Sequence, residues 1–278
     1  MKKLAVIGFP LRHSLSPVMH NTAIKHLGLD YEYLGIEIKD AAEFQEFVKY
    51  ARKELVGFNV TAPYKNAIVS FLDSASTEVQ LSGSANTVTN RNGMLHGDST
   101  DGYGLAMALR EEFGIEIRDG RFVFIGCGGA ARAASVRFLA EGASSIFFIN
   151  RTLDKAKDFS ARLRKVYNKS EIDCCSIDDK NKIKSSLNAN SIIIQSTPFG
   201  LKKDDPIPLD PSLLHEDLIV FDMIYQDTKF LTSAKQIGCK CANGKLMLLY
   251  QGAKSFSLWT NLEPPIPVIK AAIASIIY

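Results

Sequence analysis

Lys65 closes the segment NVTAPYK (59–65), which follows an apolar, strand-like run and precedes a helix-like one. A cation in the first turn of a helix opposes the partial positive charge of the helix N-terminus, which costs about 0.3 to 1 kcal/mol at an exposed site. Residues that break such a local rule occur preferentially at functional sites. Lys65 is therefore a candidate functional residue, with a solvated lysine as the alternative.

Four other polar residues have both a functional and a structural interpretation. The hydroxyls of Ser14 and Ser16 stand beside an expected helix N-terminus, where they suit a small carboxylate, although Ser16 can equally be the N-cap. Asp101 in GDSTDG (97–102) can likewise be the cap of the helix that follows. Asn86 is either a polar contact or an ordinary loop residue.

A glycine-rich turn in RFVFIGCGGAAR (121–132) is a candidate nucleotide site. Gly126, Gly128 and Ala131 form the pattern G-x-G-x-x-A directly after an expected strand and at the start of an expected helix. Glycines at these positions allow a tight turn, and they let backbone amides approach a pyrophosphate at the helix N-terminus. The context favours a dinucleotide over a structural turn.

The residues after the next strand distinguish between the two nicotinamide cofactors. NAD sites tend to carry an acidic residue there for the ribose diol, whereas this chain has Asn150, Arg151 and Thr152, with Lys155 one turn later. A cation suits the 2′-phosphate of NADP. We therefore predict NADP, and the alternative is that Arg151 and Lys155 are solvated charges.

The elements that position the first group of residues form a small α/β unit. Apolar runs, caps and turn residues are the signals on which these elements are predicted. We expect strands at 4–8, 31–38 and 56–60, helices at 16–27, 40–51 and 63–72, and a hairpin at 87–98 that turns at Asn92-Gly93.

A second unit begins after an expected helix at 101–114. Its strands are apolar enough to be buried on both faces and alternate with helices, which predicts a parallel doubly wound sheet. We expect strands at 121–125, 144–150, 191–196 and 218–222, a helix at 130–140, and a helix with Ala156, Phe159, Leu163 and Val166 on one face.

Composition excludes several classes of protein. The 278 residues are 46% hydrophobic and 23% charged, which is typical of a soluble globular chain of two domains. A net charge of +3 is too small to indicate nucleic acid or a membrane surface as a partner. A small anionic ligand stays open as a partner. Five cysteines without a CxxC pair indicate reduced thiols in the cytoplasm, and five histidines without ligand spacing give no metal site.

The whole chain resembles the shikimate dehydrogenases, because seven of their motifs occur here in the family's order. They are HSLSP (13–17), NVTAPYK (59–65), SANT (84–87), GDSTDG (97–102), GCGGAAR (126–132), NRT (150–152) and YQGAKSFSLW (250–259). The resemblance implies NADPH-dependent, reversible reduction of 3-dehydroshikimate to shikimate, a step of chorismate and aromatic amino acid biosynthesis. It also implies a catalytic domain of residues 1–101 and 246–278, whose C-terminal helices return to it, and a Rossmann domain of residues 102–245 for NADP.

The family's functional residues map onto this chain position by position. The implied catalytic residues are Lys65 and Asp101. The implied substrate-binding residues are Ser14, Ser16, Thr61, Lys65, Asn86, Asp101, Tyr225 and Gln251. The implied cofactor-binding residues are Gly126, Cys127, Gly128, Gly129, Ala130, Ala131, Asn150, Arg151, Thr152, Lys155, Met223 and Gly244.

The chain departs from the family pattern at three positions. Gln195 begins QSTPFG (195–200) where many members read NAT before a proline and a glycine, Cys127 stands at a variable position of the glycine turn, and Ser99 replaces a common asparagine. Two rival functions stay open: a relative that oxidises quinate with NAD, and a sensor of NADP or shikimate without turnover. The partner is a small molecule in each case, and the protein is a monomer or a homodimer.

Overall fold

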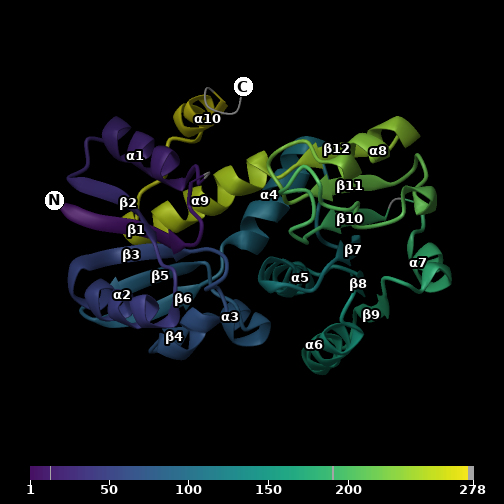
Figure 1. Ribbon diagram of the computed structural model, residues 1–278, viewed down its shortest axis with the longest axis horizontal. Helices are drawn as coiled ribbons and strands as arrows, with labels where there is room; N and C mark the ends of the chain where they lie inside the picture. The colour runs from purple at the N-terminus through teal and green to yellow at the C-terminus, as the bar shows by residue number, and fades with distance from the viewer. Residues whose placement is uncertain (13, 190, 275–278) are drawn as a thin grey trace. The chain divides into compact units, whose positions relative to one another are not determined.

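The computed structural model describes residues 1–12, 14–189 and 191–274. The chain divides into two compact units, Met1–Gly104 with Leu249–Tyr278, and Leu105–Leu248. Both boundaries fall inside helices, the first in α4 (Asp101–Phe113) and the second in α9 (Lys245–Thr260) (Figure 1). The first unit is therefore built from two separate segments of the sequence.

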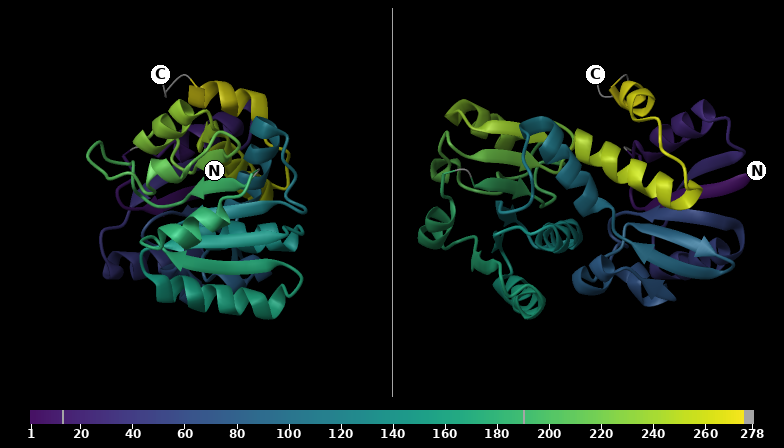
Figure 2. Two further views of the ribbon diagram at one scale, coloured as in Figure 1. Left: turned by 90° about the vertical axis from the view of Figure 1, so that its right-hand side faces the viewer. Right: turned by 180° about the vertical axis from the view of Figure 1, so that it is seen from behind.

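The first unit contains a mixed six-stranded sheet in the order β2-β1-β3-β5-β6-β4. β1 pairs in parallel with β2 and β3, whereas β5 pairs antiparallel with β3 and β6. The strands are β1 (Lys2–Gly8), β2 (Tyr31–Glu37), β3 (Leu55–Val60), β4 (Ser74–Ala75), β5 (Thr87–Arg91) and β6 (Met94–Asp98). The right-hand view of Figure 2 shows the predicted β5–β6 hairpin, whose turn has positive φ angles at Asn92 (54°) and Gly93 (87°).

Helices bury both faces of this sheet. α2 (Ala41–Glu54) begins at the predicted cap Asp40, whose carboxylate accepts from the amides of Ala42 and Glu43, and its apolar side packs on β1 and β3. The remaining helical segments of the unit are α1 (Ser16–His26), the 3₁₀ helix η1 (Ala67–Phe71), α3 (Thr77–Ser82) and α10 (Ile266–Ala274). α1 packs against β2 and α10.

The second unit contains a parallel six-stranded sheet in the order β12-β11-β10-β7-β8-β9, which Figure 1 shows from top to bottom on its right side. Read from β9, this is the doubly wound order 3-2-1-4-5-6, with the change of direction between β7 and β10. The strands are β7 (Arg121–Ile125), β8 (Ser145–Asn150), β9 (Glu171–Ser176), β10 (Ile192–Gln195), β11 (Ile219–Asp222) and β12 (Lys240–Asn243). The predicted α/β class is confirmed.

The helical segments between these strands are α5 (Gly129–Ala140), α6 (Leu153–Val166), α7 (Lys180–Ser186), η2 (Pro211–Leu213) and α8 (Lys229–Ile237). On α6, Ala156, Phe159 and Leu163 are buried as predicted, whereas Val166 is exposed at the end of the helix. β9, β12, α7 and α8 were not predicted. Within the described residues, no helix is both long and apolar enough to cross a membrane.

Candidate active site

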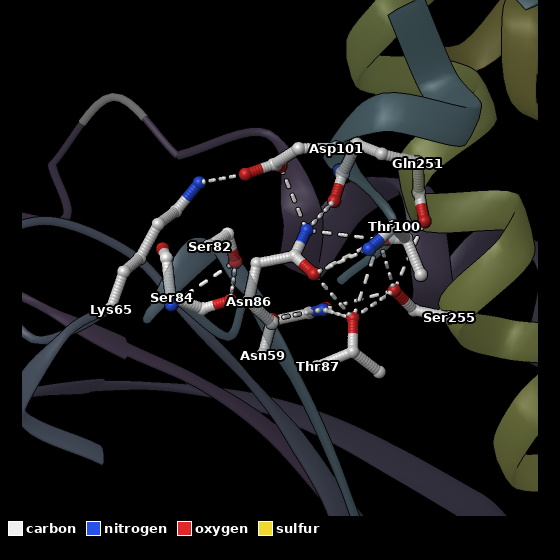
Figure 3. A network of polar contacts seen from close by, with 10 residues as sticks. All are labelled: Asn59, Lys65, Ser82, Ser84, Asn86, Thr87, Thr100, Asp101, Gln251 and Ser255. Atoms are coloured by element: carbon white, nitrogen blue, oxygen red, sulfur yellow. Dashed lines mark hydrogen bonds and ion pairs between the residues drawn. The ribbon is translucent and has the colours of Figure 1, made fainter. Parts of the chain in front are cut away.

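Lys65 and Asp101 form an ion pair in the first unit, with 2.6 Å between Lys65 Nζ and Asp101 Oδ2 (Figure 3). The side chains are 22% and 6% exposed, respectively. Burying a carboxylate to this extent costs free energy of folding unless the group is paired and hydrogen-bonded. The pairing explains how Asp101 is tolerated there, and it leaves the more exposed ammonium group of Lys65 accessible to a ligand.

The predicted helix at 63–72 is wrong, because residues 62–66 form turns and only Ala67–Phe71 are helical, as a 3₁₀ helix. Lys65 therefore does not lie in the first turn of an α-helix, and the expected conflict with a helix dipole does not arise. The turn is tied to the segment before β5, since the amide of Ala85 donates to the carbonyl of Lys65 (2.9 Å). This contact brings Lys65 beside Asn86.

Asn86 links the acidic group to the C-terminal segment of the unit. Its side chain is 3% exposed, and Nδ2 donates to Asp101 Oδ1 (2.8 Å) and to Gln251 Oε1 (3.2 Å). The two oxygens of Asp101 thus have different partners, an amide for Oδ1 and an ammonium group for Oδ2. Lys65, Asn86, Asp101 and Gln251 meet at one place, although they are far apart in the sequence.

Sheet topology explains this convergence. Thr61 follows the carboxyl end of β3, Asn86 precedes β5, and Asp101 is the third residue after β6. Because β5 runs antiparallel to both neighbours, pairing Asn59 with Thr87 and Thr87 with Asp98, all three positions lie at one edge of the sheet. Ligands of open α/β sheets bind at the carboxyl ends of the parallel strands, which here include β1 and β3.

Ser14, Ser16 and Thr61 follow the carboxyl ends of β1 and β3. The amide of Thr61 donates to the carbonyl of Ile7 (2.8 Å), and that of Ser14 to Leu11 (2.9 Å). The prediction that Ser16 caps α1 is wrong, because Leu15 occupies the N-cap position and Ser16 is the first residue inside the helix. Its position inside the helix removes the capping explanation for this hydroxyl. His13 of the HSLSP motif lies outside the described residues.

Asp101 is likewise inside its helix, as the first residue of α4. Its carboxylate oxygens accept hydrogen bonds from the side chains of Asn86 and Lys65, which belong to other elements. The alternative that Asp101 serves mainly as a helix cap is therefore not favoured by the geometry.

The glycine turn of the second unit has the geometry that a pyrophosphate site requires. Gly126 has φ = 101°, a backbone conformation that residues with a side chain rarely adopt. Its amide donates to the carbonyl of Ile149 (2.8 Å). Gly128 is the N-cap of α5, and no described atom lies within 4 Å of the place that a Cβ atom there would take. The first-turn amides of Gly129, Ala130 and Ala131 begin this helix, so the residues present fit a dinucleotide phosphate.

This turn lies at the point where the strand order reverses. A Cβ atom at Gly126 would approach Ser196 Oγ and Thr197 Cγ2, which follow β10, to 3.0 Å. The guanidinium Nε of Arg132 donates to the carbonyl of Cys127 (3.0 Å) and so fastens the turn to α5. Burial raises the pKa of the Cys127 thiol, so this residue contributes its backbone to the turn and not a reactive thiolate.

Polar and basic residues surround the start of α6. Asn150 Nδ2 donates to the carbonyl of Thr152 (2.7 Å), which closes the turn after β8, and Thr152 is the N-cap residue of the helix. Arg151 and Lys155 are exposed at this end of α6. Two cations beside a helix N-terminus suit a phosphate group that lies against the neighbouring glycine turn.

Met223 and Gly244 touch each other, and a Cβ atom at position 244 would lie 2.2 Å from the carbonyl oxygen of Met223. Only glycine fits there. Tyr225, two residues after Met223, is half-buried, and burial raises the pKa of its hydroxyl, which stays protonated as a donor. All three belong to the second unit. They are thus not in the same unit as the Lys65–Asp101 pair.

Gln195, the departure from the family pattern, has its amide engaged inside the second unit. Nε2 donates to the carbonyls of Thr197 (3.1 Å) and Phe199 (3.0 Å), and Oε1 accepts from the amide of Thr197. The side chain thus shapes the loop after β10. In residues 1–12, 14–189 and 191–274, no cluster of three or more His, Cys, Asp or Glu side chains could hold a metal ion.

Sequence reasoning missed four buried polar residues that adjoin this site: Asn59, Thr87, Thr100 and Ser255 (Figure 3). One signal was available. Ser255 follows Gln251 by four residues in a predicted helical segment, and this spacing places both side chains on one face of a helix.

A doubly wound sheet with a glycine turn at its reversal point, in a chain that also pairs a lysine with an aspartate, defines the class of nicotinamide-dependent oxidoreductases. Family models match three segments of this chain: "Shikimate dehydrogenase substrate binding domain" at residues 6–88, "Shikimate / quinate 5-dehydrogenase" at 108–200 and "Shikimate 5'-dehydrogenase C-terminal domain" at 246–274. The chain belongs to the shikimate dehydrogenase family, as its motifs predicted.

Individual relatives extend over almost the whole chain. The shikimate dehydrogenase (NADP(+)) of Alkaliphilus metalliredigens is 39% identical over 98% of this chain and 96% of its own. The structure of a shikimate 5-dehydrogenase from Listeria monocytogenes with shikimate and NAD has a TM-score of 0.89 and 34% identity, covering 98% of this chain and 96% of that one. The enzyme from Thermus thermophilus with NADP(H) and shikimate has a TM-score of 0.85 and 31% identity, covering 99% of both chains.

Proposed function

We propose that this protein is an NADP-dependent shikimate dehydrogenase that reversibly reduces 3-dehydroshikimate to shikimate. The observation that carries the proposal is the Lys65–Asp101 pair, held by Asn86 in a chain that is 39% identical to a shikimate dehydrogenase over nearly its full length. The decisive experiment follows NADPH absorbance with 3-dehydroshikimate, and the reduction of NADP and of NAD with shikimate and with quinate.

The two residues of the pair have different roles, because Lys65 transfers the proton and Asp101 positions Lys65. Lys65 Nζ gives a proton to the carbonyl oxygen of the substrate and takes it back from the hydroxyl in the reverse direction. Asp101 Oδ2 accepts from the ammonium group at 2.6 Å, and the bond of Oδ1 with Asn86 fixes the direction in which the carboxylate faces Lys65. NADPH, when bound, supplies the hydride. The pair favours an enzyme over a sensor, because a sensor needs no proton transfer.

The two segments 1–101 and 246–278 form the catalytic domain in this proposal, and residues 102–245 bind NADP. Residues 275–278 lie outside the described residues. Ser14 and Ser16 bind the substrate carboxylate, while Thr61, Asn86, Tyr225 and Gln251 bind its hydroxyl groups. Gly126 to Ala131 bind the pyrophosphate, Asn150 to Thr152 with Lys155 bind the 2′-phosphate, and Met223 and Gly244 lie at the nicotinamide.

We expect Ser14→Ala and Ser16→Ala to raise the KM for shikimate by about tenfold each and to change kcat little. Their hydroxyls bind the carboxylate equally in the ground state and the transition state, so their loss weakens binding without raising the chemical barrier. The matched control is Ser70→Ala, which removes an exposed hydroxyl that bonds only locally, to the carbonyl of Ala67. Equal affinity of the unmutated protein for shikimate and for an analogue without the carboxylate would show that no carboxylate site exists there.

The cofactor preference rests on Arg151. A guanidinium group can donate two parallel hydrogen bonds to a phosphate, and charged hydrogen bonds of this kind contribute about 1.5 to 3 kcal/mol each. We expect Arg151→Ala to weaken NADP binding at least tenfold, to change NAD binding much less, and to leave shikimate affinity constant. The measurement is the ratio of kcat/KM with NADP to that with NAD, at one ionic strength because salt screens phosphate contacts.

Lys165→Ala is the control for Arg151→Ala, since it removes one exposed charge from the last turn of α6, the helix that begins after Arg151 and Thr152. A cofactor ratio near one in the unmutated protein would support the quinate-oxidising rival, as would a ratio that Arg151→Ala leaves unchanged. The rival has one observation in its favour, because the Listeria structure contains NAD together with shikimate.

We place the protein in a reducing compartment such as the cytoplasm, because its five cysteines are free thiols. It acts there as a monomer or a homodimer, and sedimentation at several concentrations distinguishes the two.

A further inference from the structure

We infer that Ser255 is a positioning residue of the substrate site, which acts through Asn59, Thr87 and Thr100 on the side-chain amides of Asn86 and Gln251. The role of the two amides as substrate ligands rests on the proposed function, whereas the positioning itself rests on contacts within the first unit.

Ser255 lies at the centre of a buried polar cluster that joins α9 to the sheet (Figure 3). Its hydroxyl is fully buried and lies 2.8 Å from Thr87 Oγ1, 3.2 Å from Thr100 Oγ1 and 3.1 Å from Asn59 Nδ2. These partners come from β3, from β5 and from the segment between β6 and α4. Ser255 is thus the point at which the C-terminal segment meets the elements that position Asn86 and Asp101.

The single proton of Ser255 sets the direction of these bonds. Ser255 Oγ donates to the carbonyl of Gln251 (3.0 Å), so its oxygen can only accept from the other partners. Asn59 is a donor here because the Tyr33 hydroxyl donates to Asn59 Oδ1 (2.7 Å), which turns the NH₂ group towards Ser255. The hydroxyl of Thr87 lies between two acceptors, Ser255 Oγ at 2.8 Å and Asn86 Oδ1 at 3.0 Å.

These bonds determine which way the Asn86 amide faces. Asn86 Oδ1 accepts from the amide of Thr100 (2.8 Å), and it shares the single proton of the Thr87 hydroxyl with Ser255 Oγ. A flipped amide would set its NH₂ group against the N–H of Thr100 and its oxygen 2.8 Å from Asp101 Oδ1. The cluster therefore holds Nδ2 towards Asp101 and Gln251, and Gln251 Oε1 in turn faces Asn86.

Stability alone does not require this arrangement. Buried hydrogen bonds contribute little net free energy, and apolar side chains of similar size would fill the same volume. A satisfied polar network instead selects one orientation among several. For Asn86 and Gln251 the selected orientation fixes where the oxygen and the NH₂ group of each side-chain amide lie, which is what a site for a polyhydroxylated ligand needs.

Two substitutions remove the hydroxyls, Ser255→Ala and the isosteric Thr87→Val. We expect each to lower kcat/KM for shikimate roughly three- to tenfold, as loss of about one net hydrogen bond implies, with the KM for NADP unchanged. Thr87→Ser keeps the hydroxyl and should retain the unmutated value. Ser257→Ala is the control, because Ser257 makes the same kind of bond on α9, to the carbonyl of Ala253, and should also leave kcat/KM unchanged.

A second readout is independent of turnover. The side-chain amide hydrogens of Asn86, identified in NMR spectra by their loss in Asn86→Asp, should shift and exchange faster in Ser255→Ala and Thr87→Val but not in Ser257→Ala. Unchanged Asn86 signals in both Ser255→Ala and Thr87→Val would refute the positioning role. The role would also be refuted if the signals changed in these variants while their kcat/KM stayed within twofold of that of the unmutated protein. If the unmutated protein does not reduce NADP with shikimate, the proposed function fails, and the Asn86 signals alone decide the positioning role.

Discussion

Lys65→Ala should lower kcat for shikimate oxidation by about two to four orders of magnitude, which is the usual effect of losing a general acid and base. The variant lacks Nζ, the group that lies 2.6 Å from Asp101 Oδ2 and that exchanges a proton with the substrate oxygen in the proposed reaction. Shikimate affinity should change only a few fold, because Ser14, Ser16, Asn86 and Gln251 remain. Stopped-flow and steady-state measurements of NADP reduction separate the two effects.

Lys65→Arg tests whether the charge or the transferable proton matters. Arginine keeps the positive charge beside Asp101 but releases a proton far less readily than lysine. We expect kcat to be nearly as low as in Lys65→Ala, with the stability of the unmutated protein better preserved, since the buried carboxylate stays paired. The control is Lys49→Ala, which breaks an exposed ion pair with Glu46 and should alter neither activity nor stability measurably. Near-normal turnover in Lys65→Ala would remove Lys65 from the mechanism.

Asp101→Asn should lower kcat by about a hundredfold or more while Tm changes by only a few degrees. The amide has the size of the carboxylate but replaces one acceptor oxygen by an NH₂ group, so one of the two donors, Asn86 Nδ2 or Lys65 Nζ, would face another donor. Lys65 thereby loses the carboxylate that holds its ammonium group in place. Parallel kinetics and thermal unfolding of the variant and the unmutated protein measure both quantities.

Asp98→Asn is the matched control for this substitution. Asp98 belongs to the same GDSTDG segment, is more exposed, and lies 3.6 Å from His96 Nε2 instead of facing Lys65. We expect activity close to that of the unmutated protein. A fall in the Tm of Asp101→Asn with turnover preserved would instead show that Asp101 stabilises the start of α4 and has no part in the reaction.

Signals that act over a few residues allowed much of the fold to be predicted. Asn92-Gly93 has the positive φ angles that a two-residue hairpin needs, and Asp40 caps α2, because both effects depend only on neighbouring backbone groups. Short strands carried a weaker signal. The alternation of polar and apolar residues in β9 (EIDCCS) covers only its first four residues, and β12 (KCAN) has only four residues, so neither was predicted.

The sequence by itself determined which chemical groups are present and the conformation of the turns that hold some of them, such as the glycine turn after β7. It did not determine the conformation at Lys65, which lies in a turn before a 3₁₀ helix and not in the predicted α-helix, or the position of Ser16 inside α1. Only the tertiary structure decided that Lys65, Asn86, Asp101 and Gln251 converge. The physical reason is that their contacts join residues 15 to 165 positions apart, and such contacts form only when β5 pairs between β3 and β6 and α9 packs back on the first unit.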